Sequence, residues 1–184
     1  PDSAGADPGP ACYGNGGPLT ITDCNVMLGR LRPEFFPAVF GPGGDQPLDV
    51  DIVHRLFASL AAEVGAATGA SSTAEELAEG FLTIAVENMA NAIKKISVQR
   101  GHDVTGYVLV CFGGAGGQHA CLVADRLGIE KVLVHPHAGV LSALGIGLAD
   151  VRTVSDKSVE SELSEQTLTA VLEVAEIGRA SCRE

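Results

Sequence analysis

Two strand–turn–helix units near the C-terminal end of the chain constrain its fold more than any other feature. The apolar run Tyr107–Phe112 breaks into the glycine-rich loop Gly113-Gly-Ala-Gly-Gly-Gln-His119, and Lys131–Val134 leads into His137–Gly147. An apolar, β-branched run that ends in glycines and continues amphipathically predicts a strand, a tight turn and a helix start. Two consecutive units of this kind predict an α/β layer with a parallel pair of strands, 107–112 and 131–135.

Several helices are expected around this layer. A short helix, capped by Thr22 or Asp23, is expected to run through Leu28 and to end at Gly29. The spacing of apolar residues from Asp49 to Gly65 predicts a second helix, with one apolar face. That face consists of Val53, Leu56, Phe57, Leu60 and Val64. Further helices are expected over 138–149 and over 164–175.

A long helix is predicted between residues 73 and 101. Thr73-Ala-Glu-Glu76 is a capping-box pattern, and Gly101 supplies the stop. One face of this helix carries an apolar stripe, formed by Leu77, Phe81, Ile84, Asn88, Ala92 and Ile96. Asn88 falls within this stripe, and we expect it to be a satisfied core amide rather than a ligand contact.

Composition and charge exclude some classes of function. The chain has 184 residues, a formal net charge of −11 and 46% hydrophobic residues. This excess of acidic residues argues against a nucleic-acid or anionic-membrane surface, and no apolar run approaches the ~20 residues of a membrane span. We expect an acidic cytoplasmic protein. Its five cysteines, with no Cys-x-x-Cys spacing, are expected to be buried thiols in a reducing compartment, and they are Cys12, Cys24, Cys111, Cys121 and Cys182.

The two ends of the chain are unusual. Residues 1–47 are dense in glycine and proline, which favours ordered turns, and Ser3–Tyr13 is either a rigid binding wall or a structural turn. Residues 176–184 match a translated sequencing adapter, so we expect them not to belong to the fold. The missing initial methionine adds to the expectation that this is a piece of a longer protein.

The glycine-rich loop is compatible with more than one role. A phosphate-binding P-loop requires a Lys and a Ser or Thr after the last glycine, and neither follows Gly117. A dinucleotide site requires a small residue where His119 stands, and an acidic residue after the next strand, where His135 stands. The remaining candidates are an adenosine-binding loop of the actin and sugar-kinase type, or glycines that only permit tight strand–helix packing. We predict the former, with nucleotide contacts from Gly113, Gly114, Ala115, Gly116, Gly117 and Gln118.

The histidines are the other candidate polar groups. His119, His135 and His137 have no clustered acidic residues or cysteines at ligand spacing, so we predict no metal site. A histidine near a helix N-terminus has its neutral form favoured, so a hydrogen bond from His119 to a substrate or nucleotide and a purely structural role both remain open.

The order and spacing of several motifs across residues 1–152 resemble the hydantoinase A/oxoprolinase family. These motifs are Pro1–Tyr13, Thr20–Asp23, Leu28–Leu31, Arg100–Asp103, Phe112–Gly116 and Gly139–Gly145. Gly116-Gly-Gln-His-Ala-Cys121 and Phe40–Leu48 are similar to the ATP-dependent 5-oxoprolinase branch rather than to hydantoinases and acetone carboxylases. The resemblance implies the C-terminal part of an actin-like, ribonuclease H-like ATPase domain over residues 1–152. The start of a following segment is expected over 153–175.

The resemblance also implies an activity: hydrolysis of 5-oxo-L-proline to L-glutamate, coupled to cleavage of ATP. It implies Mg²⁺ with ligands outside this chain, a hydantoinase B-like region as partner in the same polypeptide, and possible homo-oligomers. The catalytic residues are not identified, and the chain alone is expected to be inactive. Two alternatives remain: a hydantoinase or acetone carboxylase β-like subunit, and a non-catalytic nucleotide-binding module.

Overall fold

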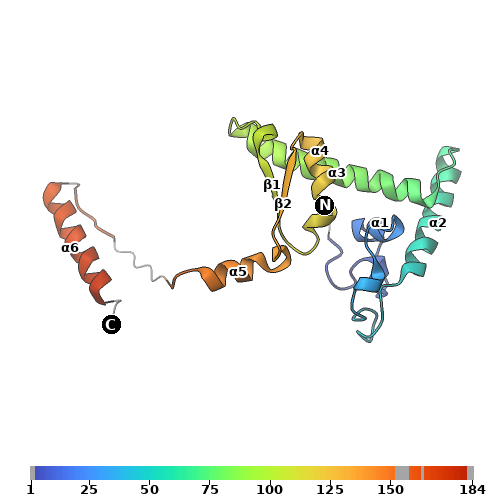
Figure 1. The fold of residues 1–184 in the computed structure, drawn as a ribbon, viewed down its shortest axis with the longest axis horizontal. Coiled ribbons are helices and arrows are strands. Elements are labelled where there is room, and N and C mark those ends of the chain that lie inside the picture. The colour runs from blue at the N-terminus through green and yellow to red at the C-terminus, as the bar shows by residue number, and fades with distance from the viewer. Residues whose placement is uncertain (1–2, 152–157, 163, 182–184) are drawn as a thin grey trace. The chain divides into compact units, whose positions relative to one another are not determined.

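The computed structural model describes residues 3–151, 158–162 and 164–181, and it divides into two units, Pro1–Leu141 and Ser142–Glu184. The first unit carries most of the secondary structure (Figure 1). It mixes helices with a parallel strand pair, which confirms the predicted α/β class. Within the described residues, no helix is both long enough and apolar enough to cross a membrane.

The glycine- and proline-rich N-terminal segment is ordered around a short helix. The 3-10 turn η1 (Ala11–Tyr13) precedes α1 (Ile21–Met27), and η2 (Pro33–Phe35) follows it. The cap of α1 is Thr20, whose side chain and Asp23 form a capping box, so the predicted cap at Thr22 or Asp23 is wrong. Asp23 lies at the third helical position, where its carboxylate reaches back to the cap.

Two longer helices follow. Asp49 caps α2 (Val50–Thr68), which ends at the left-handed Gly69, four residues beyond the predicted end. Thr73 and Glu76 form the predicted capping box of α3 (Ala74–Gln99). One core forms where α1, α2 and α3 meet, and its buried members include Cys12, Cys24, Met27, Leu48, Val53, Phe57 and Ala78.

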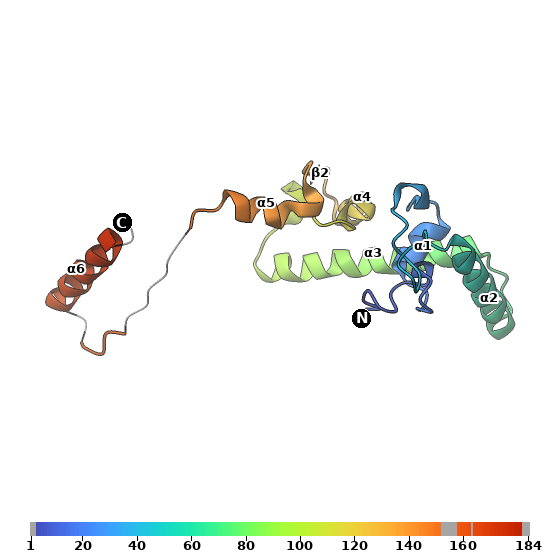
Figure 2. The same ribbon diagram turned by 90° about the horizontal axis from the view of Figure 1, so that it is seen from below.

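The predicted strand pair is confirmed. β1 (Val108–Cys111) pairs in parallel with β2 (Lys131–Val134), and Val108 lies opposite Lys131. α4 (Ala120–Leu127) connects them and lies between the sheet and α3 (Figures 1 and 2). A second core fills this layer, with Val86, Ala90, Val123, Ala124, Leu127 and Ile129 buried.

The buried face of α3 is not the predicted one. Its buried residues are Ala78, Leu82, Val86 and Ala90. Phe81, Ile84 and Ile96 of the predicted stripe are exposed, and so is Asn88, so the expectation of a core amide is wrong. Helices α1, α2 and α4 all approach α3 from the side of Ala78 and Val86.

One cysteine prediction also fails. Cys12, Cys24 and Cys111 are buried free thiols, as expected, whereas Cys121 is exposed. The buried face of α4 is formed by Ala120, Val123 and Ala124, so Cys121 lies on the exposed side of the helix. Cys182 lies outside the described residues.

The second unit begins within the helix that follows the sheet. The 3-10 turn η5 (Ala138–Val140) precedes α5 (Leu141–Leu148), where the sequence predicts a single helix over 138–149. The predicted last helix is α6 (Glu165–Ser181). It begins one residue later than expected and extends into the stretch that was expected not to belong to the fold.

Candidate functional site

The glycine-rich loop links the end of β1 to α4. Gly113 has a φ of +93°, a conformation that favours glycine, and its N–H donates to the carbonyl of Ala138 at 2.8 Å. This bond ties the loop to the turn that follows β2. Gly116–Gln118 then form the 3-10 turn η4, and His119 caps α4.

The four loop glycines are not equivalent. Positive φ requires glycine at position 113, and a Cβ at Gly116 would lie 2.9 Å from the Cys111 sulfur. A Cβ at Gly114 or Gly117 would meet no atom within 4 Å. Tight strand–helix packing therefore explains Gly113 and Gly116 but not Gly114 and Gly117. These two positions, with the exposed Ala115, leave the backbone open to close approach by a ligand.

The end of the loop is held by α1 and the turn after it. The Asn25 side-chain amide donates to Gln118 Oε1 at 3.0 Å, and the Arg30 guanidinium donates to the Gln118 carbonyl at 2.9 Å. Asn25 is buried and lies 3.4 Å from His119 Nε2. The structure thus brings together the predicted residue Gln118 and two residues, Asn25 and Arg30, that the sequence patterns did not single out.

Asp23, which lies on α1 like Asn25, binds the N-terminal segment through its carboxylate. Its carboxylate is fully buried and accepts hydrogen bonds from the N–H groups of Cys12 at 2.8 Å and Ala11 at 3.2 Å. It also accepts from the N–H of Thr20 at 2.7 Å and the hydroxyl of Thr20 at 2.9 Å. Burial, and then the negative charge of Asp23, raises the pKa of the Cys12 thiol far above its ordinary value.

A cavity of about 1080 Å³ opens beside this segment. Its walls come from the N-terminal segment, α1, α2, α3 and His119, and the residues on its lining include Ser3, Tyr13, Thr20, Phe57, Phe81 and Asn88. Among the residues that the structure describes, those on the cavity lining carry no formal charge at neutral pH. Ser3, Ala4 and Gly5 line the cavity, and the hydrogen bonds from Ala11 and Cys12 to Asp23 give the same segment a structural role.

His119 lies at the border between the loop and this cavity. Burial, and secondarily the positive charge of Arg30, holds the pKa of His119 below its ordinary value, whereas the sequence prediction of a neutral ring relied on the helix N-terminus. Its Nδ1 atom is buried and has no hydrogen-bond partner among the described residues. His135 accepts a hydrogen bond from the His137 N–H at 3.0 Å, a local turn contact away from the cavity lining.

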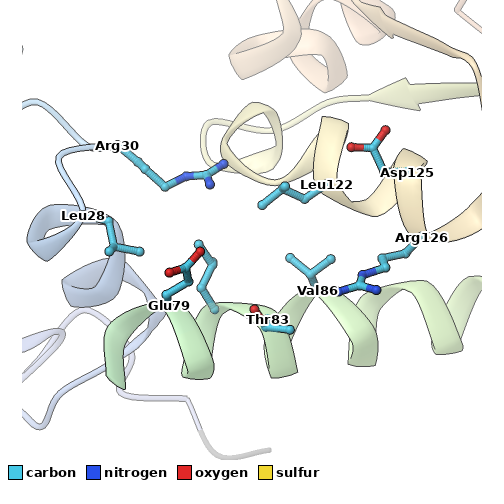
Figure 3. A pocket seen from close by; sticks show the side chains of 9 residues that line it. Leu28, Arg30, Glu79, Thr83, Val86, Leu122, Asp125 and Arg126 are labelled. Carbon is cyan, nitrogen blue, oxygen red and sulfur yellow. The ribbon is translucent and has the colours of Figure 1, made fainter. Parts of the chain in front are cut away.

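A second, smaller hollow of about 560 Å³ lies between the turn after α1, α3 and α4. Figure 3 shows Arg30 extending across it toward the segment that leads into α4, with Glu79 on the α3 side. Arg126 at the far end is paired with Glu87 at 3.0 Å. The hollow therefore has both signs of charge, and its most distinctive side chain is the arginine that contacts the loop.

Comparison with known proteins identifies the family. A sequence profile of the Hydantoinase/oxoprolinase family matches residues 1–155. The chain belongs to this family. It is 53% identical over 151 residues to a 5-oxoprolinase of Saccharomyces cerevisiae, an alignment that covers 82% of the chain and 12% of that protein. The resemblance found in the motifs is confirmed.

Two solved structures share the fold of this chain. An ATP-dependent caprolactamase from Pseudomonas jessenii superposes with a TM-score of 0.66 at 31% identity, covering 100% of this chain and 26% of that one. A nucleotide-free acetone carboxylase superposes with a TM-score of 0.64 at 28% identity, and the match covers 82% of this chain and 20% of the acetone carboxylase chain. The chain spans 12–14% of the length of curated relatives that it matches at 46–53% identity.

Proposed function

We propose that this chain is part of an ATP-dependent 5-oxoprolinase, which hydrolyses 5-oxo-L-proline to L-glutamate. The observation that carries the proposal is the level of identity within the family. The chain is 53% identical over 151 residues to the 5-oxoprolinase of S. cerevisiae but 34% identical over 153 residues to the caprolactamase subunit alpha of P. jessenii. In this proposal residues 1–152 are the C-terminal part of the ATPase domain, and 153–175 begin the next segment.

The glycine-rich loop is the proposed contact with the nucleoside of ATP, through residues 113–118. Gly114 and Gly117 support this assignment, because none of the described residues would be closer than 4 Å to a Cβ there. Their exposed backbone lets a flat base or a sugar approach the loop closely. Gln118 would add a polar side chain, already oriented by Asn25.

ATP would supply the phosphoryl group that activates the stable amide of the lactam ring toward water. This chain contributes one wall of the nucleotide site, and His119 offers a neutral ring where the loop meets the uncharged cavity. We propose that the Mg²⁺ ligands and the phosphate-binding segments lie outside this chain. Among the residues that the structure describes, no three His, Cys, Asp or Glu side chains are grouped as metal ligands would be.

The partners follow from the same proposal. A hydantoinase B-like region of the same polypeptide would complete the enzyme, and the substrate would be 5-oxo-L-proline. A reducing cytoplasm suits the four described cysteines, all of which are free thiols. Homo-oligomers are compatible with the proposal but are not required by it.

A different cyclic amide is the second candidate. The fold match to the caprolactamase covers 100% of this chain, and the described part of the cavity lining has no formal charge to pair with a substrate carboxylate. Two other functions are the remaining alternatives: acetone carboxylation, to which the match with acetone carboxylase points, and nucleotide binding without catalysis.

Product analysis of the full-length protein that contains this chain separates these functions. The proposal expects glutamate from 5-oxoproline only when ATP is present, with one ADP formed per glutamate. Carbamoyl amino acids from hydantoins, aminocaproate from caprolactam or acetoacetate from acetone would each assign a different activity. ATP binding without turnover of any of these substrates would favour the binding module.

A further inference from the structure

The contacts between α1 and the glycine-rich loop form a two-point hold on one residue. Asn25 holds the side chain of Gln118, and Arg30 holds its backbone carbonyl, at 3.0 and 2.9 Å. The contacts join positions more than eighty residues apart in the chain. Gln118 is therefore held in position at both its side chain and its main chain.

Asn25 is itself held rigidly. It is 1% exposed, and its side-chain amide donates to the carbonyl of Ile21 at 3.1 Å as well as to Gln118. The amide nitrogen has two hydrogens and donates to two carbonyl oxygens, whereas Oδ1 is buried and has no hydrogen-bond partner among the described residues. A buried side chain whose position is set by its own helix can orient a loop better than a mobile surface side chain can.

The opposite end of the loop has a separate attachment. Gly113 is bound to Ala138, whereas a Cβ added at Gly114 or Gly117 would have no neighbouring atom within 4 Å. The middle of the loop is consequently open, and its two ends are anchored. The anchor at Gln118 comes from α1 and the turn after it, and Asp23 on α1 holds Thr20, which lines the cavity.

We propose that Asn25 and Arg30 are positioning residues that hold Gln118 so that the glycine-rich loop is preorganised for nucleotide binding. The inference rests on the proposed function of the loop. Because Asp23 anchors the cavity wall and Asn25 anchors the loop, α1 is a rigid bridge between the two. Preorganisation lowers the conformational cost of binding, so loss of the hold reduces affinity without removing a ligand contact.

The test uses the full-length protein and three single variants: Asn25→Ala and Arg30→Met, which remove the hold alone, and Gln118→Ala, which also removes the side chain proposed to contact the nucleotide. Asn25→Ala and Arg30→Met are each expected to raise the KM for ATP about tenfold, the effect of one lost hydrogen bond at a buried or charged group, and Gln118→Ala at least as much. The KM for the cyclic amide is expected to stay within about twofold, because the substrate is not bound by this hold. Asn91→Ala, an exposed amide on α3 with no contact to the loop, is the matched control and should change neither value.

A double variant separates a shared hold from general destabilisation. Asn25→Ala combined with Gln118→Ala should have no larger effect on the KM for ATP than the stronger single variant, because both remove the same bond. Multiplicative effects would overturn the proposal. A lowered melting temperature with an unchanged KM for ATP would overturn it as well. If Asn25→Ala does not fold, Arg30→Met tests the proposal instead, because its side chain is exposed.

Hydrogen exchange of the nucleotide-free protein tests the hold independently of the activity. Peptides covering residues 112–121 should exchange about tenfold faster in Asn25→Ala and Arg30→Met than in the wild type or Asn91→Ala. Unchanged exchange in both variants would refute the hold. Faster exchange in the variants of a protein whose wild type turns over no cyclic amide would refute the proposed function and leave the hold standing.

Discussion

Replacing Asp23 by alanine should destabilise the first unit strongly. The carboxylate is fully buried and accepts hydrogen bonds from the buried N–H groups of Ala11 and Cys12. Each buried donor left without a partner costs about 1–3 kcal/mol, so the two together cost roughly 4 kcal/mol. The N–H and hydroxyl of Thr20 are half-buried, where water can replace the carboxylate, and they add less.

Tyrosine fluorescence during urea unfolding measures this effect. The chain has no tryptophan, and both of its tyrosines, Tyr13 and Tyr107, lie in the first unit. The free energy of unfolding follows by linear extrapolation. Asp125→Ala, at an exposed carboxylate on α4, is the matched control and should change the stability by less than about 0.5 kcal/mol.

The isosteric change Asp23→Asn refines the prediction. It keeps the shape and one accepting oxygen but turns an NH₂ group toward the donors, so we expect about half of the loss caused by alanine. A loss below about 1 kcal/mol for Asp23→Ala would refute the reasoning, because the two buried donors would then have found other partners. Equal losses for Asp23→Ala and Asp125→Ala would refute it as well.

Three further predictions concern single positions. Gly17→Ala should prevent the native turn, since its Cβ would lie 1.8 Å from the Gly9 carbonyl oxygen, and circular dichroism should show a melting temperature lower by several degrees. Gly114→Val should weaken ATP binding by the full-length protein about tenfold or more, because the side chain would block close approach of the nucleotide to the loop. The melting temperature should stay unchanged, because the Cβ has open space. Unchanged ATP affinity would show that the loop is structural only. Burial raises the pKa of the Cys24 thiol from 9.0 to about 11. The stability that the protonated thiol contributes is therefore complete below pH 9.0 and is lost between pH 9.0 and 11. Denaturation curves taken across this range should show a smaller loss of stability for Cys24→Ala than for the wild type. Finally, the 184-residue chain alone should hydrolyse no ATP in a phosphate-release assay, and robust turnover would overturn the assignment of residues 1–152.

Local patterns predicted the elements of the first unit well. The capping box at Thr73 and Glu76, the apolar spacing that begins near Asp49 and the two glycine-terminated strands are short-range signals, and the structure has an element at each. The cap of α1 was misplaced because Thr20 and Thr22 are both capable of capping. The local capping box of Thr20 with Asp23 selects Thr20, and the packing of η1 adds the hydrogen bonds from the N–H groups of Cys12 and Ala11 to the same carboxylate.

The buried face of α3 shows what periodicity leaves open. Ala78, Leu82 and Val86 repeat every four residues, as the exposed residues Phe81, Ile84 and Asn88 nearly do, so both stripes satisfy the helical period. The larger side chains suggested one face, but the neighbouring helices cover the other. Small residues such as Ala78 and Ala90 let those helices approach closely, a property that a count of apolar residues does not reveal.

The family, the α/β class and the glycine-rich loop could all be predicted before the structure was known, because each is carried by short motifs whose own residues are adjacent in the chain. The tertiary structure decided which loop glycines are needed for packing, since the neighbour of Gly116 is the Cys111 sulfur and Gly114 has none. It also decided the contacts of Asn25 and Arg30 with Gln118. No pattern within α1 predicts a partner that lies about ninety positions away, because such a contact exists only after the two cores have packed.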